Sequence, residues 1–195
     1  VFQEDRLLPF KTVLENLTLV GADREEALYH LNALNIGQAA NKYPRRLSGG
    51  MSRRAAIARA LCADYNVLVL DEPAAGLDPV GRSTIFDAVE RYRAGTGATV
   101  IIVSHSMEDM AQYCDDVAVM AHARLLMTGT RDEVFARADE LEAVGLDIPV
   151  ITKLSALLRQ GGMPLDPGLY TLEAAEAALA QVFGLPADRE GGRKR

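Results

Sequence analysis

The chain has 195 residues, of which 49% are hydrophobic and 25% are charged, a composition that fits a globular protein and excludes an intrinsically disordered one. Its formal net charge is -6 at pH 7, and its basic residues cluster only at the extreme C-terminus, so we expect no nucleic-acid partner. No apolar run reaches the roughly 18 to 20 residues of a membrane-spanning helix, and the N-terminus lacks the basic and apolar regions of a signal peptide.

The N-terminal part of the chain is predicted to be helical. Apolar residues within residues 11–34 lie on one face of a short helix and then of a longer helix that begins after Asp23. After a polar turn at residues 41–46, Ser48 and two glycines precede a run of strong helix formers within residues 47–64. The first 64 residues are therefore assigned to one predominantly helical region.

A strand, helix and strand pattern follows. Residues 67–70 and 99–103 are short continuous apolar runs, and residues 80–93 between them have helical periodicity. This spacing predicts a parallel strand pair with a right-handed crossover, hence an α/β fold. Three further elements are expected downstream: a helix at 107–113, a strand at 117–120 and a short paired strand at 125–128.

The sequence changes character after residue 135. Two helical segments are predicted at residues 150–160 and 172–183, separated by a turn rich in glycine and proline. We interpret residues 136–195 as a C-terminal helical extension with a basic tail.

Polar residues end both predicted parallel strands. Asp71 and Glu72 follow the first strand, and Ser104 and His105 follow the second. Ligands bind beyond the carboxyl ends of parallel strands, so these side chains are expected at one edge. Adjacent carboxylates repel each other unless a cation neutralises them, which suits a hydrated Mg²⁺ and leaves the second acid to orient a water. The alternative is that both acids only cap the next turn.

The sequence LSGG at residues 47–50 is a second candidate element. Ser48, Gly49 and Gly50 stand where backbone N–H groups at a helix start can approach an anion closely, and the helix dipole favours negative charge there. Taken alone, the same residues favour a plain helix N-cap, and the anion-binding interpretation depends on the motifs that follow.

Five motifs in this order resemble those of the ATP-binding cassette (ABC) ATPases. LSGGM at 47–51 resembles the signature, VLVLDE at 67–72 the Walker B strand, and GLDP at 76–79 the D-loop. His105 in VSHS resembles the switch histidine, and Gln3 in VFQ resembles the Q-loop glutamine. The resemblance implies a partial P-loop NTPase (RecA-like) parallel sheet core with an inserted helical subdomain and the C-terminal extension.

The resemblance also implies ATP and Mg²⁺ as cofactors and gives the strand-end residues their roles. Asp71 would hold Mg²⁺ through water, and Glu72 would act as catalytic base or polarise the attacking water. His105 would contact the γ-phosphate, and Gln3 would sense the metal and the attacking water.

The family works as a head-to-tail dimer, so a second ABC ATPase subunit is an implied partner. Ser48, Gly49 and Gly50 would bind the γ-phosphate of a nucleotide held by the facing subunit, and Asp78 would act across that interface. The partner ATPase can be identical or a paralogue.

The sequence departs from the family in two ways. Met51 follows LSGG where many relatives have glutamine, which removes one polar contact. No GxxxxGK[ST] loop, the phosphate-binding Walker A segment, occurs in the sequence. Because this loop normally precedes the Q-loop, we expect the sequence to begin partway through a longer protein and the chain alone to be inactive.

The two halves resemble different importers. The sequence from VSHS through residue 166 resembles the ATPase subunits of energy-coupling factor importers of vitamins and metals, whereas residues 1–17 resemble the ATPases of nitrate, sulfonate and taurine importers. We favour the energy-coupling factor type because its similarity is more extensive. A hydrolysis-incompetent interaction fragment is the rival from another class, and a soluble cassette protein of translation or DNA repair is disfavoured because no long insertion or basic arm is present.

Three regions follow: residues 1–64 with Q-loop, helical subdomain and signature, residues 65–135 with the RecA-like core, and residues 136–195 as the extension. Residues 4–46 would receive a coupling helix from transmembrane transporter subunits, which implies a peripheral protein at the cytoplasmic face of the cell membrane. The apolar face of residues 150–183 has two readings, packing on the chain's own core or contact with the second ATPase subunit.

Overall fold

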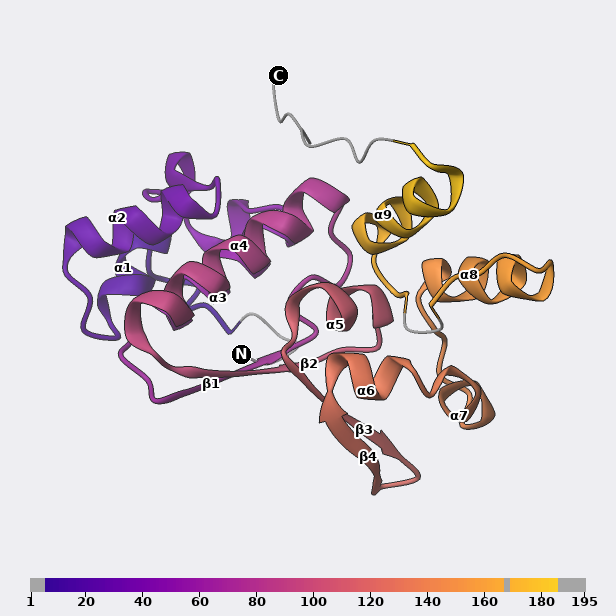
Figure 1. The fold of residues 1–195 in the computed structure, drawn as a ribbon. Helices are drawn as coiled ribbons and strands as arrows, with labels where there is room; N and C mark the ends of the chain where they lie inside the picture. The colour runs from indigo at the N-terminus through magenta and orange to yellow at the C-terminus, as the bar shows by residue number, and fades with distance from the viewer. Residues whose placement is uncertain (1–5, 167–168, 186–195) are drawn as a thin grey trace. The chain divides into compact units, whose positions relative to one another are not determined.

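A computed structural model describes residues 6–166 and 169–185 of the chain. The chain divides into two compact units, Val1–Ser104 and His105–Arg195, called unit 1 and unit 2 below (Figure 1). The mixture of helices and strands agrees with the predicted α/β fold class, whereas the predicted three-region division stays a prediction.

Side-chain caps start the helices of unit 1. Thr12 and Glu15 form a reciprocal capping box, with the Glu15 N–H donating to Thr12 Oγ1 at 3.2 Å and the Thr12 N–H donating to Glu15 Oε2 at 2.7 Å. Asp23 accepts from the Glu26 N–H at 2.9 Å and starts the next helix. The helices are α1 (Val13–Thr18), α2 (Arg24–Ala33), α3 (Gly49–Leu61) and α4 (Pro79–Thr96), with short 3₁₀ turns η1 (Gly37–Ala39) and η2 (Pro44–Arg46).

The predicted parallel pair is confirmed as strands β1 (Val67–Asp71) and β2 (Thr99–Val103), which pair in register from Val67 opposite Thr99 to Asp71 opposite Val103. Leu68 and Leu70 are buried on one face of the pair. The opposite face is apolar and exposed, with Val69 at 45% and Ile101 at 47%. This exposure is unusual because parallel strands are ordinarily covered on both faces.

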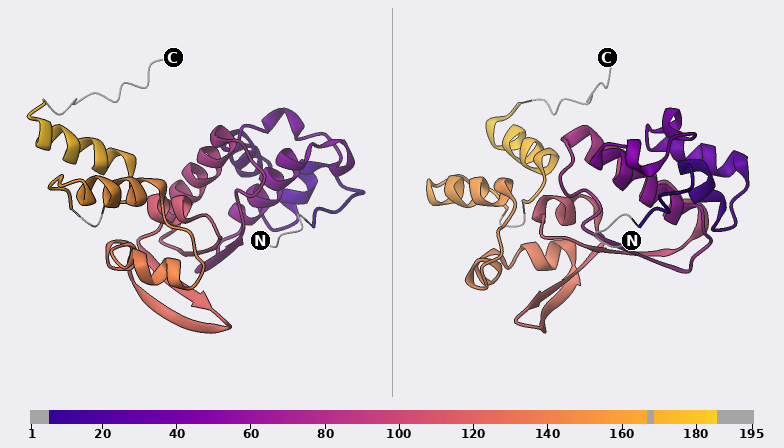
Figure 2. Two further views of the ribbon diagram at one scale, coloured as in Figure 1. Left: turned by 90° about the vertical axis from the view of Figure 1, so that its right-hand side faces the viewer. Right: turned by 180° about the vertical axis from the view of Figure 1, so that it is seen from behind.

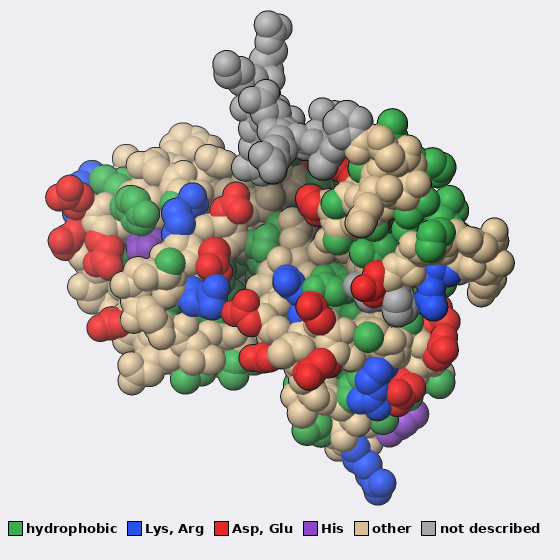
Figure 3. Space-filling view, in the orientation of Figure 1, with side chains coloured by type: hydrophobic (Ala, Val, Ile, Leu, Met, Phe, Trp, Pro, Cys, Tyr) green, Lys and Arg blue, Asp and Glu red, His purple; other side chains and the backbone are tan. Residues whose placement is uncertain are grey.

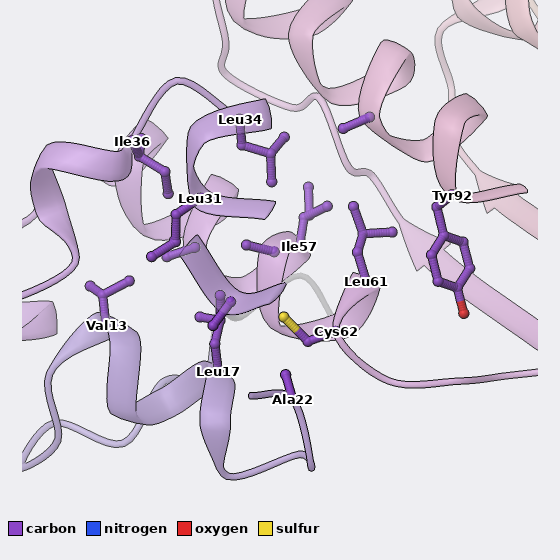
Figure 4. Close-up of a cluster of buried hydrophobic side chains, with 14 of the residues drawn as sticks. Val13, Leu17, Ala22, Leu31, Leu34, Ile36, Ile57, Leu61, Cys62 and Tyr92 are labelled. Atoms are coloured by element: carbon purple, nitrogen blue, oxygen red, sulfur yellow. The ribbon is translucent and has the colours of Figure 1, made fainter. Parts of the chain in front are cut away.

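The core of unit 1 joins its helices to the buried face of β1. Leu17, Leu31, Ile57 and Leu61 come from α1, α2 and α3 and lie close together, with exposed fractions of 2% or less (Figure 4). On α4, the Tyr92 hydroxyl donates to the Ala63 carbonyl at 2.9 Å and so ties this helix to the segment that leads into β1.

Asn16 is a polar member of this interior. It is fully buried, and its Oδ1 accepts from the Leu8 N–H at 2.7 Å while its Nδ2 donates to the carbonyls of Leu8 and Thr12 at 3.2 and 2.9 Å. Burial of an amide is favourable only when such bonds are made. Asn16 therefore fixes the segment that leads into α1, a role for which the sequence offered no signal.

Unit 2 combines a β-hairpin with short helices. Helices α5 (Met107–Tyr113), α8 (Val150–Gln160) and α9 (Leu172–Phe183) have the predicted bounds. Two helices that the periodicity did not reveal follow the hairpin, because they have only five and six residues. They are α6 (Arg131–Phe135), which Thr130 and Glu133 start with a capping box, and α7 (Ala138–Ala143). Within the described residues no helix is long and apolar enough to span a bilayer.

The hairpin of unit 2 turns on two residues with unfavourable backbone angles. Strands β3 (Asp116–Ala121) and β4 (Arg124–Thr130) pair antiparallel, as Figure 2 shows, with an irregularity between Val119 and Met120. The two turn residues, His122 and Ala123, have φ of 50° and 57°. Two-residue turns with both φ positive ordinarily hold Asn-Gly, because residues with a Cβ are strained in this region.

Replacing His122 by Asn and Ala123 by Gly together should stabilise the hairpin by about 1 kcal/mol, because asparagine and glycine adopt a positive φ at lower cost than histidine and alanine. Native-state hydrogen exchange of the β3 and β4 amides measures this directly. As a control, Ala118→Gly in the middle of β3 should lower protection, since glycine weakens a strand interior. Equal or lower protection of these amides in the double variant than in the original chain would contradict the assignment of strain to the turn.

Candidate active site

The ends of β1 and β2 bring the predicted acids to one edge of the parallel pair. Asp71 is the last residue of β1 and lies opposite Val103. The Glu72 N–H donates to the Val103 carbonyl at 2.8 Å, so the pairing continues one residue past the strand. Beyond Val103, the Ser104 hydroxyl donates to Glu72 Oε2 at 3.2 Å. Asp71, Glu72 and Ser104 are each half-buried, which leaves this edge accessible to a polar ligand.

The backbone at Glu72 is strained. Its φ is 44°, in the left-handed region that side chains with a Cβ rarely adopt, and the following Pro73 also disfavours a right-handed helical conformation at this position. A conformation of this kind costs on the order of 1 kcal/mol or more and persists where the surrounding structure enforces it. Such strain concentrates at functional sites, which agrees with the role that the resemblance gives Glu72.

Asp78 begins α4 as its N-cap. Its Oδ1 accepts from the Gly81 N–H at 3.2 Å. A Cβ at Gly81 would come within 2.7 Å of the same oxygen, so a larger residue at this position would require the Asp78 carboxylate to shift. Asp78 is exposed, and Gly76, two residues before it, has a φ of 72°. The predicted D-loop is thus a tight turn whose aspartate is locally held and open to solvent.

The signature segment meets this turn at one point. A Cβ at Gly50 would lie 3.0 Å from Leu77 Cδ2, so the start of α3 approaches the turn closely. A Cβ at Gly49 would meet nothing within 4 Å, which leaves open space at the helix start. Ser48 is the N-cap, and its Oγ accepts from the Met51 N–H at 3.4 Å. The N-cap reading is therefore correct in itself, and it leaves the other N–H groups of the first turn available for an anion.

Two predicted site residues are not placed with the others. His105 follows Ser104 in the sequence and is exposed, but it is the first residue of unit 2, so its approach to the β1–β2 edge stays a prediction. Gln3 lies outside the described residues.

Asp71 and Glu72 could contribute to a metal site, but they do not form a complete set of protein ligands. Among the residues that the structure describes, no group of three or more His, Cys, Asp or Glu side chains is placed to hold a metal ion. Mg²⁺ usually takes one or two carboxylates and fills its remaining positions with water and substrate phosphates, so Asp71 could serve that ion while Glu72 remains available for another role.

Unit 1 also contains a hollow of about 850 Å³ that is separate from the predicted site residues. It lies among α2, the end of α3 and α4, and none of the predicted site residues lines it. Burial lowers the pKa of His30 in its wall and, with the nearby Glu26 charge, raises the pKa of the Cys62 thiol to about 12. The Cys62 thiol is therefore protonated at neutral pH and unsuited to nucleophilic chemistry.

Comparison with known proteins identifies the family. Residues 1–75 match the model of the ABC transporter family. The chain is 48% identical over 143 residues to the energy-coupling factor transporter ATP-binding protein EcfA2 of Symbiobacterium thermophilum, covering 73% of the chain and 49% of the relative. The chain belongs to the ABC transporter family. Within this family it is similar to the energy-coupling factor type: EcfA2 of Caldanaerobacter subterraneus is 39% identical over 170 residues, or 86% of the chain and 59% of that relative.

Solved ABC ATPases confirm the P-loop NTPase fold class. A bacterial ABC transporter cassette solved as a dimer is 29% identical, with a TM-score of 0.61 over 67% of this chain and 61% of that one. The cbiO1 protein of Clostridium perfringens, part of the ABC transporter complex cbiONQ, is 30% identical, with a TM-score of 0.60 over 80% of this chain and 63% of that one. The chain spans about half the length of several curated relatives that it matches.

Two contacts at the candidate site were not predicted from the sequence. Ser104 was noticed at the end of its strand but received no role, although a hydroxyl at a parallel strand end opposite an acid is a usable signal. The contact of Leu77 with Gly50 had no signal, because 27 residues separate the two positions and only the packing of α3 against the turn joins them.

Strain at Glu72 can be measured by comparing two substitutions that both remove the carboxylate. The free energy of unfolding of Glu72→Gly should exceed that of Glu72→Ala by about 1 kcal/mol, because glycine adopts a positive φ without a Cβ clash. Equilibrium urea unfolding of the full-length protein gives both free energies. Equal stabilities, or a more stable alanine variant, would show that the left-handed backbone at this position is not strained.

Proposed function

We propose that the full-length protein is the ATP-hydrolysing subunit of an ABC importer of the energy-coupling factor type. The names of its relatives support this, as does one geometric observation: adjacent acids at the carboxyl edge of a parallel pair, with Glu72 held by backbone and side-chain hydrogen bonds. The sequence contains no GxxxxGK[ST] loop, so we propose that these 195 residues alone bind ATP poorly and do not turn it over.

The acids divide the chemistry between them. Bound Mg²⁺ would neutralise charge on the phosphates of ATP. Asp71, at the end of β1, would hold the hydrated ion. Glu72, one residue further and turned by its positive φ, would orient the attacking water and accept its proton. His105 would contact the γ-phosphate, and Gln3 would sense the metal and the water.

The start of α3 would act on a nucleotide held by the facing subunit. Open space at Gly49, the close approach at Gly50 and the N–H groups of the first turn together suit a phosphate oxygen. Asp78 lies beside this segment through Leu77 and would act across the same interface. A head-to-tail dimer thus completes each site with residues of both subunits.

The remaining partners would be transmembrane transporter subunits. A coupling helix would dock on residues 4–46, which places the protein peripherally at the cytoplasmic face of the cell membrane. The transported substrate would be selected by those subunits, because the residues described above act on a nucleotide and not on a cargo.

Replacing Glu72 by Gln should lower kcat for MgATP hydrolysis by about a hundredfold or more, because an amide cannot accept the water's proton. Nucleotide affinity should be preserved, since the side chain keeps its size and Asp71 is unchanged. The assay uses the full-length protein assembled with its transporter partners, and the exposed Glu142→Gln on α7 serves as the matched control. Hydrolysis at the original rate by Glu72→Gln would remove Glu72 from the proposed role.

We also propose that α8 and α9 contact the second ATPase subunit. The two helices lie side by side in unit 2 (Figure 2). The residues that α8 buries are polar, Thr152 and Ser155, and the Thr152 hydroxyl has no hydrogen-bond partner within the described part of the chain. Three of its apolar side chains are instead exposed, Val150 at 66%, Leu154 at 44% and Leu157 at 64%, while Ile151 and Leu158 are half-buried. The helix therefore turns its apolar stripe outward, as a surface that requires a partner does.

Charge favours a related subunit as that partner. Apolar side chains gather over α8 and α9 in Figure 3, and Phe183 on α9 is 61% exposed. The charged residues of α8 are both basic, including Arg159, whereas those of α9 are both acidic, including Glu173. A two-fold arrangement would place α8 of each subunit against α9 of the other, so that opposite charges flank the buried apolar stripe.

Placing a charge in the α8 stripe should weaken dimerisation. Leu157→Glu should raise the dimer dissociation constant at least about tenfold, because the carboxylate would be buried without a partner. Sedimentation equilibrium of the full-length protein measures this constant, and Gln160→Glu adds the same charge on α8 outside the stripe. Unchanged dimerisation of Leu157→Glu would assign the exposed stripe to another partner.

A further inference from the structure

We infer that Ser104 is a positioning residue for the Glu72 carboxylate. Its hydroxyl donates to Glu72 Oε2 at 3.2 Å from the end of the neighbouring strand. The inference rests on the proposed function, because a held carboxylate matters for turnover only if Glu72 acts on the attacking water.

The end of β2 holds Glu72 at two points. The Val103 carbonyl accepts from the Glu72 N–H at 2.8 Å, and the next residue along β2 supplies the hydroxyl that reaches the carboxylate. The parallel register fixes this relation, because Asp71 lies opposite Val103 and the residues that follow each strand therefore face each other. The backbone bond restrains where Glu72 leaves the strand, and the bond from Ser104 restrains where its carboxylate lies.

A glutamate at this place needs the second constraint. Its side chain has three rotatable bonds and is only half-buried, so backbone geometry alone does not fix its carboxylate. A hydroxyl that donates to one carboxylate oxygen restricts the orientation of the whole carboxylate group. General-base catalysis depends on such placement, because the base must come within hydrogen-bond reach of the proton that it removes.

The residue type suits this role. Serine supplies a donor on the shortest available side chain, so the hydroxyl stays close to the strand end and its position varies little. Threonine keeps the same Oγ and is tolerated at strand ends, whereas alanine removes the donor and leaves the backbone unchanged. These two substitutions therefore separate loss of the hydroxyl from loss of the local fold.

The test compares MgATP hydrolysis by full-length variants assembled with their transporter partners. Ser104→Ala should lower kcat about tenfold and leave KM for ATP nearly unchanged, because one hydrogen bond to a charged group is lost and nucleotide contacts are kept. Ser104→Thr should restore most of kcat. Ser83→Ala on α4, which removes a hydroxyl that donates to the Val80 carbonyl at 3.1 Å, should leave both constants unchanged.

A double-variant cycle with Glu72→Gln separates this inference from the proposed function. If Ser104 acts through the carboxylate, Ser104→Ala should lower kcat far less in the Glu72→Gln background than in the original protein. An equal drop in both backgrounds, or an unaltered kcat in Ser104→Ala when Glu72→Gln is inactive, overturns the positioning role and leaves the proposed function intact. Full activity of Glu72→Gln would instead defeat the proposed function itself.

Discussion

The parallel pairing of β1 with β2 is the constraint on which the candidate site depends. A slip of one residue would turn each side chain of β1 to the opposite face and separate Glu72 from Ser104. Hydrophobic alternation does not prevent such a slip, because both faces of the pair are apolar. Backbone hydrogen bonds at both ends of the pair help to set the register. The Thr99 N–H donates to the Asn66 backbone carbonyl at one end, and the Glu72 N–H donates to the Val103 backbone carbonyl at the other. The bond that helps to set the register is thus also the bond that places the proposed base.

Two glycines connect this edge to the rest of unit 1. Gly81 admits the Asp78 cap that starts α4, and Gly50 admits Leu77 against the start of α3. The turn from Glu72 to Asp78 is therefore held at both ends, by the strand ladder and by the first turn of a helix. A positive φ at Glu72 can persist because the turn is held on either side of it. The start of α3 and the proposed base are consequently connected through this turn, by the contact of Gly50 with Leu77 at one end and the hydrogen bond of Glu72 to Val103 at the other.

The burial of α8 in unit 2 shows which of its faces is exposed, which the periodicity of its sequence alone does not decide. The pattern of α8 is strongly amphipathic, and such a helix normally buries its apolar face within its own domain. Here Thr152 and Ser155 face inward, and Val150, Leu154 and Leu157 face outward. The apolar residues that unit 2 does bury come largely from elsewhere, including Phe135, Leu141 and Leu165. The exposed stripe is therefore surplus to the core, which supports its assignment to an interface.

The sequence by itself determined most elements and which polar residues end the two parallel strands. Caps such as Ser48, continuous apolar runs and turn glycines act over a few residues, so the bounds of α5, α8 and α9 followed from local pattern. Short helices such as α6 escaped because five residues hold too little periodicity. Only the tertiary structure decided the hydrogen bond from Ser104 to Glu72, the Gly50 contact with Leu77 and the outward face of α8. These contacts join residues distant in sequence or depend on burial, and register and packing, not local preference, determine both.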